Sequence, residues 1–248
     1  MRIAFLTTSV PLYLPSLFER VLNVYEDQTA GVFLVPPLGE GQMMGGPLRY
    51  YATFGLMASL HLLARTLRAK AHGETITAVC RRHGVLCESV PSVNDPVFLR
   101  RLRSLGTDLI VSVSCPQIFR KPLIELPSRG TINVHGSILP SYRGVSPAFW
   151  MMANGERRAG VSAFFVNEGI DAGDLCGQRV FDLQPDDTLD RFLQRSKQEA
   201  AELVVDVLRQ VESGTVSRTP LDIRNGSYYS WPTRAAVRRL LAGGRRLW

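Results

Sequence analysis

Apolar and polar positions along the chain follow two periods. Short apolar runs are typical of buried strands, and apolar residues spaced three and four apart are typical of helices. Strands are predicted at residues 2–9, 31–35, 85–89, 108–113, 130–135 and 175–183. Helices are predicted at residues 17–25, 48–70, 75–83, 95–105 and 188–213. Because strands and helices alternate, we expect an α/β fold, with an open, mostly parallel, twisted sheet and helices on both faces.

The helix predicted at residues 48–70 is the most apolar of the chain. Its apolar stretch is shorter than the about 20 residues that a membrane-spanning helix needs, and His61 interrupts it. We therefore interpret it as a core helix or a dimer interface. Binding to a membrane surface is the alternative, supported by the flanking basic residues Arg49, Arg65, Arg68 and Lys70. Residues 36–47, rich in Gly, Pro and Met, are predicted to form a flexible loop on the substrate side.

Composition limits the kind of protein. With 248 residues, of which 45% are hydrophobic, the chain can bury one large core, or one core with a small C-terminal appendage. The four cysteines are scattered without metal-ligand spacing, so neither disulfides nor a structural zinc is expected. The first residues lack the features of a secretion signal, and a cytoplasmic location is expected. The net charge of +7 favours anionic partners without choosing among them.

Two nucleotide-binding signatures are absent from the sequence. No GxxxxGK[ST] loop is present, and Thr7-Thr8-Ser9-Val10-Pro11 stands where a GxGxxG turn would follow the first strand. A nicotinamide-dependent enzyme is therefore not expected. The glycines between residues 39 and 46 lack the lysine that a phosphate-binding loop carries.

The strand predicted at residues 130–135 ends in the most informative side chains. Asn133 and His135 are two positions apart, so they point to the same face of the strand before glycines and a proline turn the chain into a loop. An amide beside an imidazole can stabilise a developing oxyanion, but a carboxylate is needed to handle the proton. Asp171, in the acidic segment 167–174, is the candidate carboxylate. Each residue alone has an ordinary structural explanation, whereas the three together predict an active site.

The same residues belong to two motifs of a known family, and the chain resembles the formyltransferases that use 10-formyltetrahydrofolate. The family pattern is Asn-x-His, Ser-Leu-Leu-Pro and an aromatic-Arg-Gly turn, followed by a Gly-Val strand that leads into Leu-Asp-x-Gly-Asp. The counterparts here are Asn133-Val134-His135, Ser137-Ile138-Leu139-Pro140, Tyr142-Arg143-Gly144, Gly160-Val161 and Ile170-Asp171-Ala172-Gly173-Asp174. The resemblance covers residues 106–215 well and the first third only in outline. The family includes methionyl-tRNA, glycinamide ribonucleotide and sugar-amine formyltransferases.

This resemblance implies a Rossmann-like formyltransferase fold, 10-formyltetrahydrofolate as co-substrate and no metal. Asn133, His135 and Asp171 would be the catalytic residues. The folate pocket would be formed by two loops, Cys115, Pro116, Gln117, Ile118 and Phe119 in one, and Asn167, Glu168, Gly169, Ile170 and Asp171 in the other. Ser137, Tyr142 and Arg143 are candidates for shaping the loop or contacting the substrate. Cys115 is not expected to be a nucleophile, since no basic partner is evident.

The resemblance also implies transfer to a primary amine, whose identity the sequence leaves open. Residues 1–214 are predicted to form the catalytic domain, and residues 215–248 a short extension, too small for the β-barrel that methionyl-tRNA formyltransferases add. We therefore expect a small-molecule amine, such as a sugar nucleotide or an amino-acid or antibiotic precursor, and no nucleic acid. Methionyl-tRNA formylation, hydrolysis of 10-formyltetrahydrofolate and non-catalytic folate binding are the alternatives. A homodimer is an open option. The aromatic residues at 228–231 are predicted to pack on the sheet, with covering the mouth of the active site as the alternative.

Overall fold

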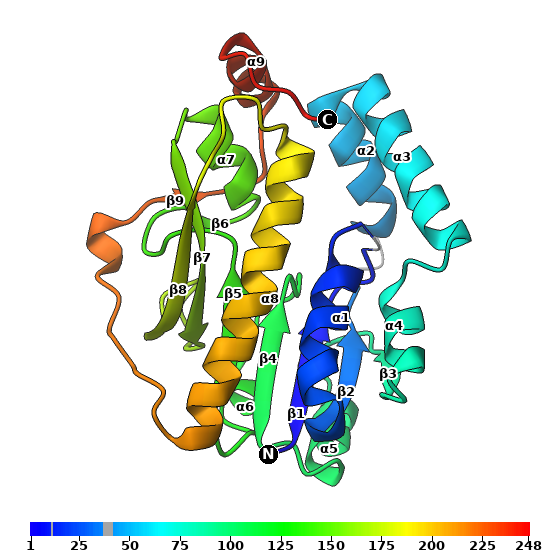
Figure 1. Ribbon diagram of the computed structural model, residues 1–248, viewed down its shortest axis with the longest axis vertical. Coiled ribbons are helices and arrows are strands. Elements are labelled where there is room, and N and C mark those ends of the chain that lie inside the picture. The colour runs from blue at the N-terminus through cyan, green and yellow to red at the C-terminus, as the bar shows by residue number, and fades with distance from the viewer. Residues whose placement is uncertain (11, 37–41) are drawn as a thin grey trace.

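The computed structural model describes residues 1–10, 12–36 and 42–248. These residues form a seven-stranded sheet in the order β3-β2-β1-β4-β5-β7-β8 (Figure 1). The strands are β1 Ile3–Thr7, β2 Thr29–Leu34, β3 Cys87–Ser89, β4 Leu109–Val113, β5 Thr131–His135, β7 Arg158–Phe165 and β8 Leu175–Asp182. Pairs from β3 to β5 are parallel, whereas β7 pairs antiparallel with both β5 and β8. The predicted α/β fold with an open, mostly parallel sheet is confirmed.

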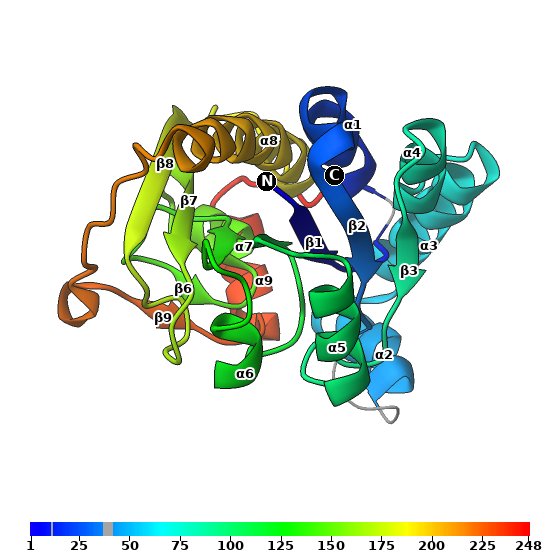
Figure 2. The same cartoon turned by 90° about the horizontal axis from the view of Figure 1, so that it is seen from below.

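Helices cover both faces of this sheet (Figure 2). Helices α1 Leu14–Tyr25 and α8 Leu189–Ser213 pack together on one face. Helices α5 Pro96–Ser104 and α6 Lys121–Ile124 lie on the other face. Alternation along the strands supplies both cores, because Val111 of β4 joins the first and its neighbour Ile110 joins the second. The remaining helices are α2 Gln42–Phe54, α3 Leu56–Ala71, α4 Ile76–Arg82, α7 Pro147–Ala153 and α9 Arg234–Ala242, with 3₁₀ turns at Glu26–Gln28 and Ile223–Asn225.

The bounds of α8 follow from its local sequence. The Thr188 hydroxyl caps the helix by accepting a hydrogen bond from the Arg191 backbone N–H at 3.2 Å. The helix ends at Gly214, whose φ of 73° lies in the left-handed region that glycine adopts without strain. Buried residues recur along it every three or four positions, among them Ala200, Val204 and Val211. The helix predicted at residues 188–213 is confirmed.

The single apolar helix predicted at residues 48–70 is instead two helices that lie side by side (Figure 1). They are separated at Gly55, where φ is +86°. Of the two predicted roles, the core helix is wrong for the apolar side of α3, where the large apolar residues are each more than half exposed, namely Leu56, Met57, Leu60, Leu63 and Leu67. A dimer interface stays a prediction. The hydropathy pattern identified an apolar helix, but it did not indicate which face of the helix is exposed to solvent. Among the described residues, no helix is long and apolar enough to cross a membrane.

The predicted loop at residues 36–47 overlaps this region. Residues 37–41 lie outside the described residues, and residues 42–47 form the first turns of α2 rather than a loop. Pro47 is accommodated inside that helix. A substrate-side role for the segment stays a prediction.

The residues after α8 return to the sheet end that carries the motifs. β9 Tyr228–Tyr229 pairs in parallel with the short strand β6 Arg143–Gly144. The Tyr229 ring stacks on Tyr142 and Trp150, with centroids 5.1 and 4.8 Å apart, and Trp231 Nε1 donates a hydrogen bond to Thr53 Oγ1 at 2.9 Å. Tyr229 therefore packs on the turn and α7, and Trp231 on α2, while packing on the sheet itself stays a prediction. A domain boundary at residue 214 stays a prediction.

Candidate active site

The side chains of Asn133 and His135 share one face of β5. Their neighbours Ile132 and Val134 point into the core under α1 and α8, so the alternation of the strand leaves the two polar residues on the opposite face. Asn133 is half-buried and pairs in register with Ser112 of β4, while His135 is 8% exposed at the carboxyl end of β5. The sheet therefore positions an amide and an imidazole together at a strand end, as predicted.

The hydrogen bonds of His135 define which ring nitrogen carries the proton. Its Nε2 lies 2.8 Å from the carbonyl oxygen of Tyr142. Because a carbonyl oxygen only accepts, Nε2 is the protonated nitrogen and donates this bond. In the neutral ring, Nδ1 is then unprotonated, and it faces Asp171 with its Oδ2 at 3.7 Å. Protonation of Nδ1 would form an ion pair with that carboxylate.

Asp171 reaches this position from the long connection between β7 and β8. Its φ is 47°, a left-handed conformation that Asp tolerates better than most residues. Its Oδ2 accepts a hydrogen bond from the Gly144 backbone N–H at 2.8 Å. A side chain at Gly144 is impossible without movement, because a Cβ there would lie 2.3 Å from the carbonyl oxygen of Tyr229. The glycine of the aromatic-Arg-Gly turn thus allows β9 and the Asp171 carboxylate to approach together.

Residues on β7 and β8 hold the loop that follows His135. Ser162 Oγ donates to the Ser137 carbonyl at 2.6 Å and accepts from the Leu139 N–H at 3.1 Å. Gln178 Nε2 also donates to this hydroxyl, at 2.8 Å. Ser137 itself is fully buried, and its Oγ donates to the Ser141 carbonyl at 2.7 Å. These bonds agree with a loop-shaping role for Ser137.

Two further predicted residues, Tyr142 and Arg143, lie in the turn beside His135. The Tyr142 phenol donates to Glu156 Oε1 at 2.6 Å, and burial together with this carboxylate raises the pKa of Tyr142 to about 12. The Tyr142 side chain is packed inside the protein, while the Tyr142 backbone carbonyl accepts the hydrogen bond from His135. Arg143 donates from Nη1 to the Ile170 carbonyl at 3.3 Å. The turn is therefore tied to the loop that carries Asp171.

The first predicted folate loop follows β4 and is anchored by Gln117. This side chain is 6% exposed, accepts from the Val93 N–H at 3.0 Å and donates to the carbonyls of Pro36 and Pro91, each at 3.0 Å. Because Gln117 joins three segments, a substitution at this position would lower the stability of the protein as well as any affinity for folate. Ile118, 61% exposed, is therefore a better probe of ligand contact than Gln117.

The other members of this loop differ in exposure. Cys115 and Phe119 are half-buried and pack against the core under α5, and Pro116 is exposed. Burial raises the pKa of the Cys115 thiol to about 11, so the thiolate needed for nucleophilic attack is scarce at neutral pH. The sequence-based expectation that Cys115 is no nucleophile agrees with this.

The second predicted folate loop, at residues 167–171, is exposed except near Asp171. Asn167 braces it, with Oδ1 accepting from the Gly169 N–H at 2.9 Å and Nδ2 donating to the Ala172 carbonyl at 3.1 Å. Glu168 and Ile170 are exposed, with Ile170 at 47%. Each predicted folate loop therefore presents an apolar side chain to solvent, which suits the planar face of a ring system.

Lys197 of α8 is a charged residue at the strand ends that sequence reasoning missed. It is half-buried, and its Nζ donates to Ser114 Oγ at 2.8 Å, immediately after β4. The preceding residue, Ser196, lies beside Gly136, 3.7 Å from the position of a Cβ there. Burial lowers the pKa of the Lys197 ammonium to about 8. No local pattern links residues so far apart, so only the fold reveals this cation beside the His135 loop.

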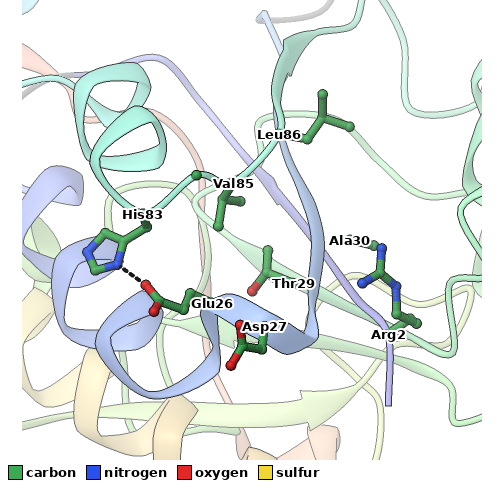
Figure 3. A pocket seen from close by; sticks show the side chains of 9 residues that line it. Arg2, Glu26, Asp27, Thr29, Ala30, His83, Val85 and Leu86 are labelled. Atoms are coloured by element: carbon green, nitrogen blue, oxygen red, sulfur yellow. Dashed lines mark hydrogen bonds and ion pairs between the residues drawn. The ribbon is translucent and has the colours of Figure 1, made fainter.

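A separate surface depression lies at the amino ends of the parallel strands, the end of the sheet opposite to His135. Its volume is about 380 Å³, and its lining residues come from the amino ends of β1 and β2 and from the segment after α4 (Figure 3). His83 there lies 2.5 Å from Glu26, through Nδ1 and Oε2. None of the predicted site residues lines this depression, so the candidate active site is the cluster around His135.

Comparison with known proteins identifies the family of this chain. The family model for formyl transferases matches residues 64–208, which include all three motif residues Asn133, His135 and Asp171. The chain belongs to the formyl transferase family. The resemblance inferred from the two motifs is thereby confirmed.

Curated relatives of the chain are methionyl-tRNA formyltransferases. The protein of Ruminiclostridium cellulolyticum is 34% identical over 146 residues, which are 59% of this chain and 47% of that protein. The protein of Anaeromyxobacter dehalogenans is 35% identical over 184 residues, 73% of this chain and 56% of that protein. The chain spans about half the length of the curated relatives it matches.

Solved structures show the same fold. A sugar N-formyltransferase from a Shewanella species is 18% identical, with a TM-score of 0.63 over 98% of this chain and 87% of that one. Glycinamide ribonucleotide transformylase 1 from Symbiobacterium toebii is also 18% identical, with a TM-score of 0.62 over 90% and 94% of the two chains. An N-formyltransferase from Helicobacter canadensis, described in complex with folinic acid and dTDP-3-aminofucose, is 15% identical, with a TM-score of 0.59 over 93% and 71%.

Proposed function

We propose that this protein transfers the formyl group of 10-formyltetrahydrofolate to the primary amine of a small molecule. The observation that carries the proposal is the meeting of its two family motifs, in which Nδ1 of His135 lies 3.7 Å from Oδ2 of Asp171 at the end of the strand that holds Asn133. Membership of the formyl transferase family supports the reaction class.

In this proposal, Asn133 and His135 stabilise the negative charge that develops on the formyl oxygen when the amine nitrogen attacks the formyl carbon. The Asn133 amide supplies one N–H donor. His135 supplies the second only when its ring is protonated, because its Nε2–H is already donated to the Tyr142 carbonyl and Nδ1 must carry the other proton. The Asp171 carboxylate, with Oδ2 3.7 Å from Nδ1, would form an ion pair with that charged form.

Asp171 completes the proton balance. The attacking amine loses one proton as the new C–N bond forms, and the departing folate nitrogen gains one as the old C–N bond breaks. Asp171 accepts the first and delivers the second, directly or through water. The Gly144 N–H holds its Oδ2 in place and leaves Oδ1 for this exchange.

The two loops around residues 115–119 and 167–171 are assigned to the folate. When bound, this co-substrate supplies an activated formyl group on a nitrogen that leaves as an amine. The exposed Ile118 and Ile170 provide apolar contact for its ring, and the braced backbone at Asn167 provides polar groups. The folinic acid complex of the Helicobacter canadensis protein, which has the same fold, supports this assignment.

Two observations favour a small acceptor with an anionic group. Lys197 brings a cation to the carboxyl ends of the strands, where ligands of open α/β sheets bind. Several basic residues elsewhere are paired with nearby carboxylates, as in the pairs Arg20–Glu202, Arg82–Glu19, Arg101–Glu88 and Arg179–Glu199. Such pairing is not the continuous basic stripe that a nucleic acid needs. A sugar nucleotide meets the requirement, and an amino-acid or antibiotic precursor with a carboxylate or phosphate does as well.

Methionyl-tRNA formylation is the second candidate, because the curated relatives carry that name. The deciding experiment incubates the protein with 10-formyltetrahydrofolate and measures tetrahydrofolate release in three arms. These arms contain a panel of sugar-nucleotide and amino-acid amines, initiator methionyl-tRNA, or no acceptor. We expect release only with small amines. Tetrahydrofolate release with tRNA alone would identify methionyl-tRNA as the acceptor. Release without any acceptor would identify the protein as a hydrolase of 10-formyltetrahydrofolate. Folate binding without turnover would indicate a non-catalytic folate-binding module.

A further inference from the structure

The outward side of α3 is apolar. Leu56, Met57, Leu60, Leu63 and Leu67 have exposed fractions between 51% and 70%. At 100° per residue, the four leucines form one line along the helix, since their spacing alternates between four and three residues. Large apolar side chains are normally exposed singly on a protein surface, so a continuous line of them indicates a partner.

The inward side of the same helix is mostly small or polar, with the half-buried Leu62 as its large apolar residue. Its buried residues are Ala58 and Ala69, and Arg65 on this side forms an ion pair with Asp190 of α8. A helix that only covers a core has the reverse arrangement, with the apolar stripe inside. The orientation of α3 is fixed by these inward contacts, so the leucines are presented to the outside by the fold itself.

Charge around this leucine line has one sign. The segment from residue 42 to residue 71 contains no Asp or Glu. The exposed cations Arg68 and Lys70 lie on opposite sides of the line. Trp248 stacks on His61 of α3 with ring centroids 4.8 Å apart and is 45% exposed, which brings the exposed Arg246 close to the same helix.

We propose that α3 lies on an anionic lipid surface, with its leucines in the acyl boundary and its flanking cations at the phosphate groups. Leucines on one face, cations at its edges and an interfacial tryptophan are the features of helices that lie in this plane. A second copy fits the charges less well. Helices that pair through such a leucine line are usually joined by opposite charges at its flanks, and the described part of this helix pair supplies cations alone.

Figure 1 shows α2 and α3 toward the same end of the molecule as the carboxyl ends of β1, β2 and β4. The inference concerns a surface outside the proposed formyl-transfer site, and its test does not depend on activity.

The experiment measures sedimentation of the full chain with vesicles of phosphatidylcholine, with and without about one third phosphatidylglycerol. We expect binding to the anionic vesicles, weakening with salt, and little binding to the neutral ones. Leu60→Gln with Leu63→Gln should weaken vesicle binding at least tenfold, since each leucine is expected to bury apolar area. Arg68→Gln and Lys70→Gln should each weaken it about fivefold.

The matched control substitutions are on a different helix, α5. Val97→Gln removes an apolar side chain that is 62% exposed, and Arg100→Gln removes an exposed cation, and neither should change vesicle binding. Circular dichroism would check that each variant is folded. Equal binding to neutral and anionic vesicles, or binding that the α3 variants leave unchanged, would overturn the proposal. So would a dimer in sedimentation equilibrium that the Leu60→Gln, Leu63→Gln variant dissociates in the absence of any vesicle binding, a result that assigns the face to a second copy.

Discussion

His135 and Asp171 face each other with Nδ1 and Oδ2 3.7 Å apart, and both are anchored to the same turn. The Tyr142 carbonyl accepts from the far side of the imidazole, while the Gly144 N–H donates to the carboxylate. One turn of three residues therefore orients an acid-base pair whose members come from different motifs. Such positioning matters because proton transfer depends on the distance and direction between the groups.

The first prediction concerns this pair. His135→Ala and Asp171→Asn should each lower kcat about a hundredfold or more, because each removes a group that acts on the developing charge or on the proton. Asn is also tolerated at the left-handed φ of residue 171, so the loop should keep its shape. Steady-state formyl transfer is the measurement, once an acceptor is known.

Asp186→Asn is the matched control for the carboxylate-to-amide change. Asp186 is exposed and lies before α8, paired only with Arg191 at 3.5 Å among the described residues. Its kcat should equal that of the unchanged protein. If a folded Asp171→Asn variant, verified by circular dichroism, kept near-normal kcat, the role given to Asp171 would be wrong.

Asn133 and His135 illustrate what the sequence predicts well. Their two-residue spacing at the end of an apolar run determines a shared face, because the strand period is local. The pairing of β4 with β5 likewise follows from the order of strands and helices. Fold class and the central motif were thus accessible from periodicity and spacing.

Other features depend on contacts between distant residues, which no local pattern carries. The Lys197–Ser114 hydrogen bond joins α8 to the residue that follows β4, and the hydrogen bonds of Gln117 to Pro36 and Pro91 depend on where three loops meet. The outward turn of α3 was missed for a related reason. Hydropathy ranks a helix as apolar, but its inward contacts, such as Arg65 with Asp190, decide which side faces the protein.

The second prediction concerns Gly144. Gly144→Ala should lower the free energy of unfolding by more than about 2 kcal/mol, because the new methyl group meets the Tyr229 carbonyl and φ is +92°. Gly155→Ala separates the two causes, since its φ is +76° but nothing lies within 4 Å of the new Cβ. It should cost only about 1 kcal/mol. Equal losses in chemical denaturation would show that the close approach of β9 contributes nothing.

The third prediction concerns pH-dependent stability at His83. Its hydrogen bond to Glu26, and then that to Glu19, raise the pKa of His83 above 6.5 in the folded protein. A raised histidine pKa stabilises the fold while the ring is charged, so this contribution is complete below the unfolded value of 6.5 and is lost as pH rises through the folded value. The stability difference between the unchanged protein and His83→Gln should therefore be largest below about pH 6.5 and shrink as pH rises above that value.

His72→Gln is the control for that measurement, because His72 is exposed at the end of α3. At pH 7 the free energy of unfolding of this variant should be close to that of the unchanged protein. A stability difference for His83→Gln that is constant with pH, or that grows as pH rises, would contradict the stabilising contacts of the charged His83 ring with Glu26 and Glu19.

The last prediction concerns Lys197. Burial lowers the pKa of its ammonium group to about 8. If this ammonium attracts an anionic acceptor, KM for the acceptor should be low while the lysine is charged and should rise as pH increases through about 8, with kcat less affected. Lys197→Met should raise KM at pH 7 about tenfold and remove this pH dependence. Lys197→Arg, which stays charged, should keep a low KM beyond pH 8. A Met variant that retained both the low KM and its rise with pH would assign that titration to another group and leave Lys197 a structural partner of Ser114.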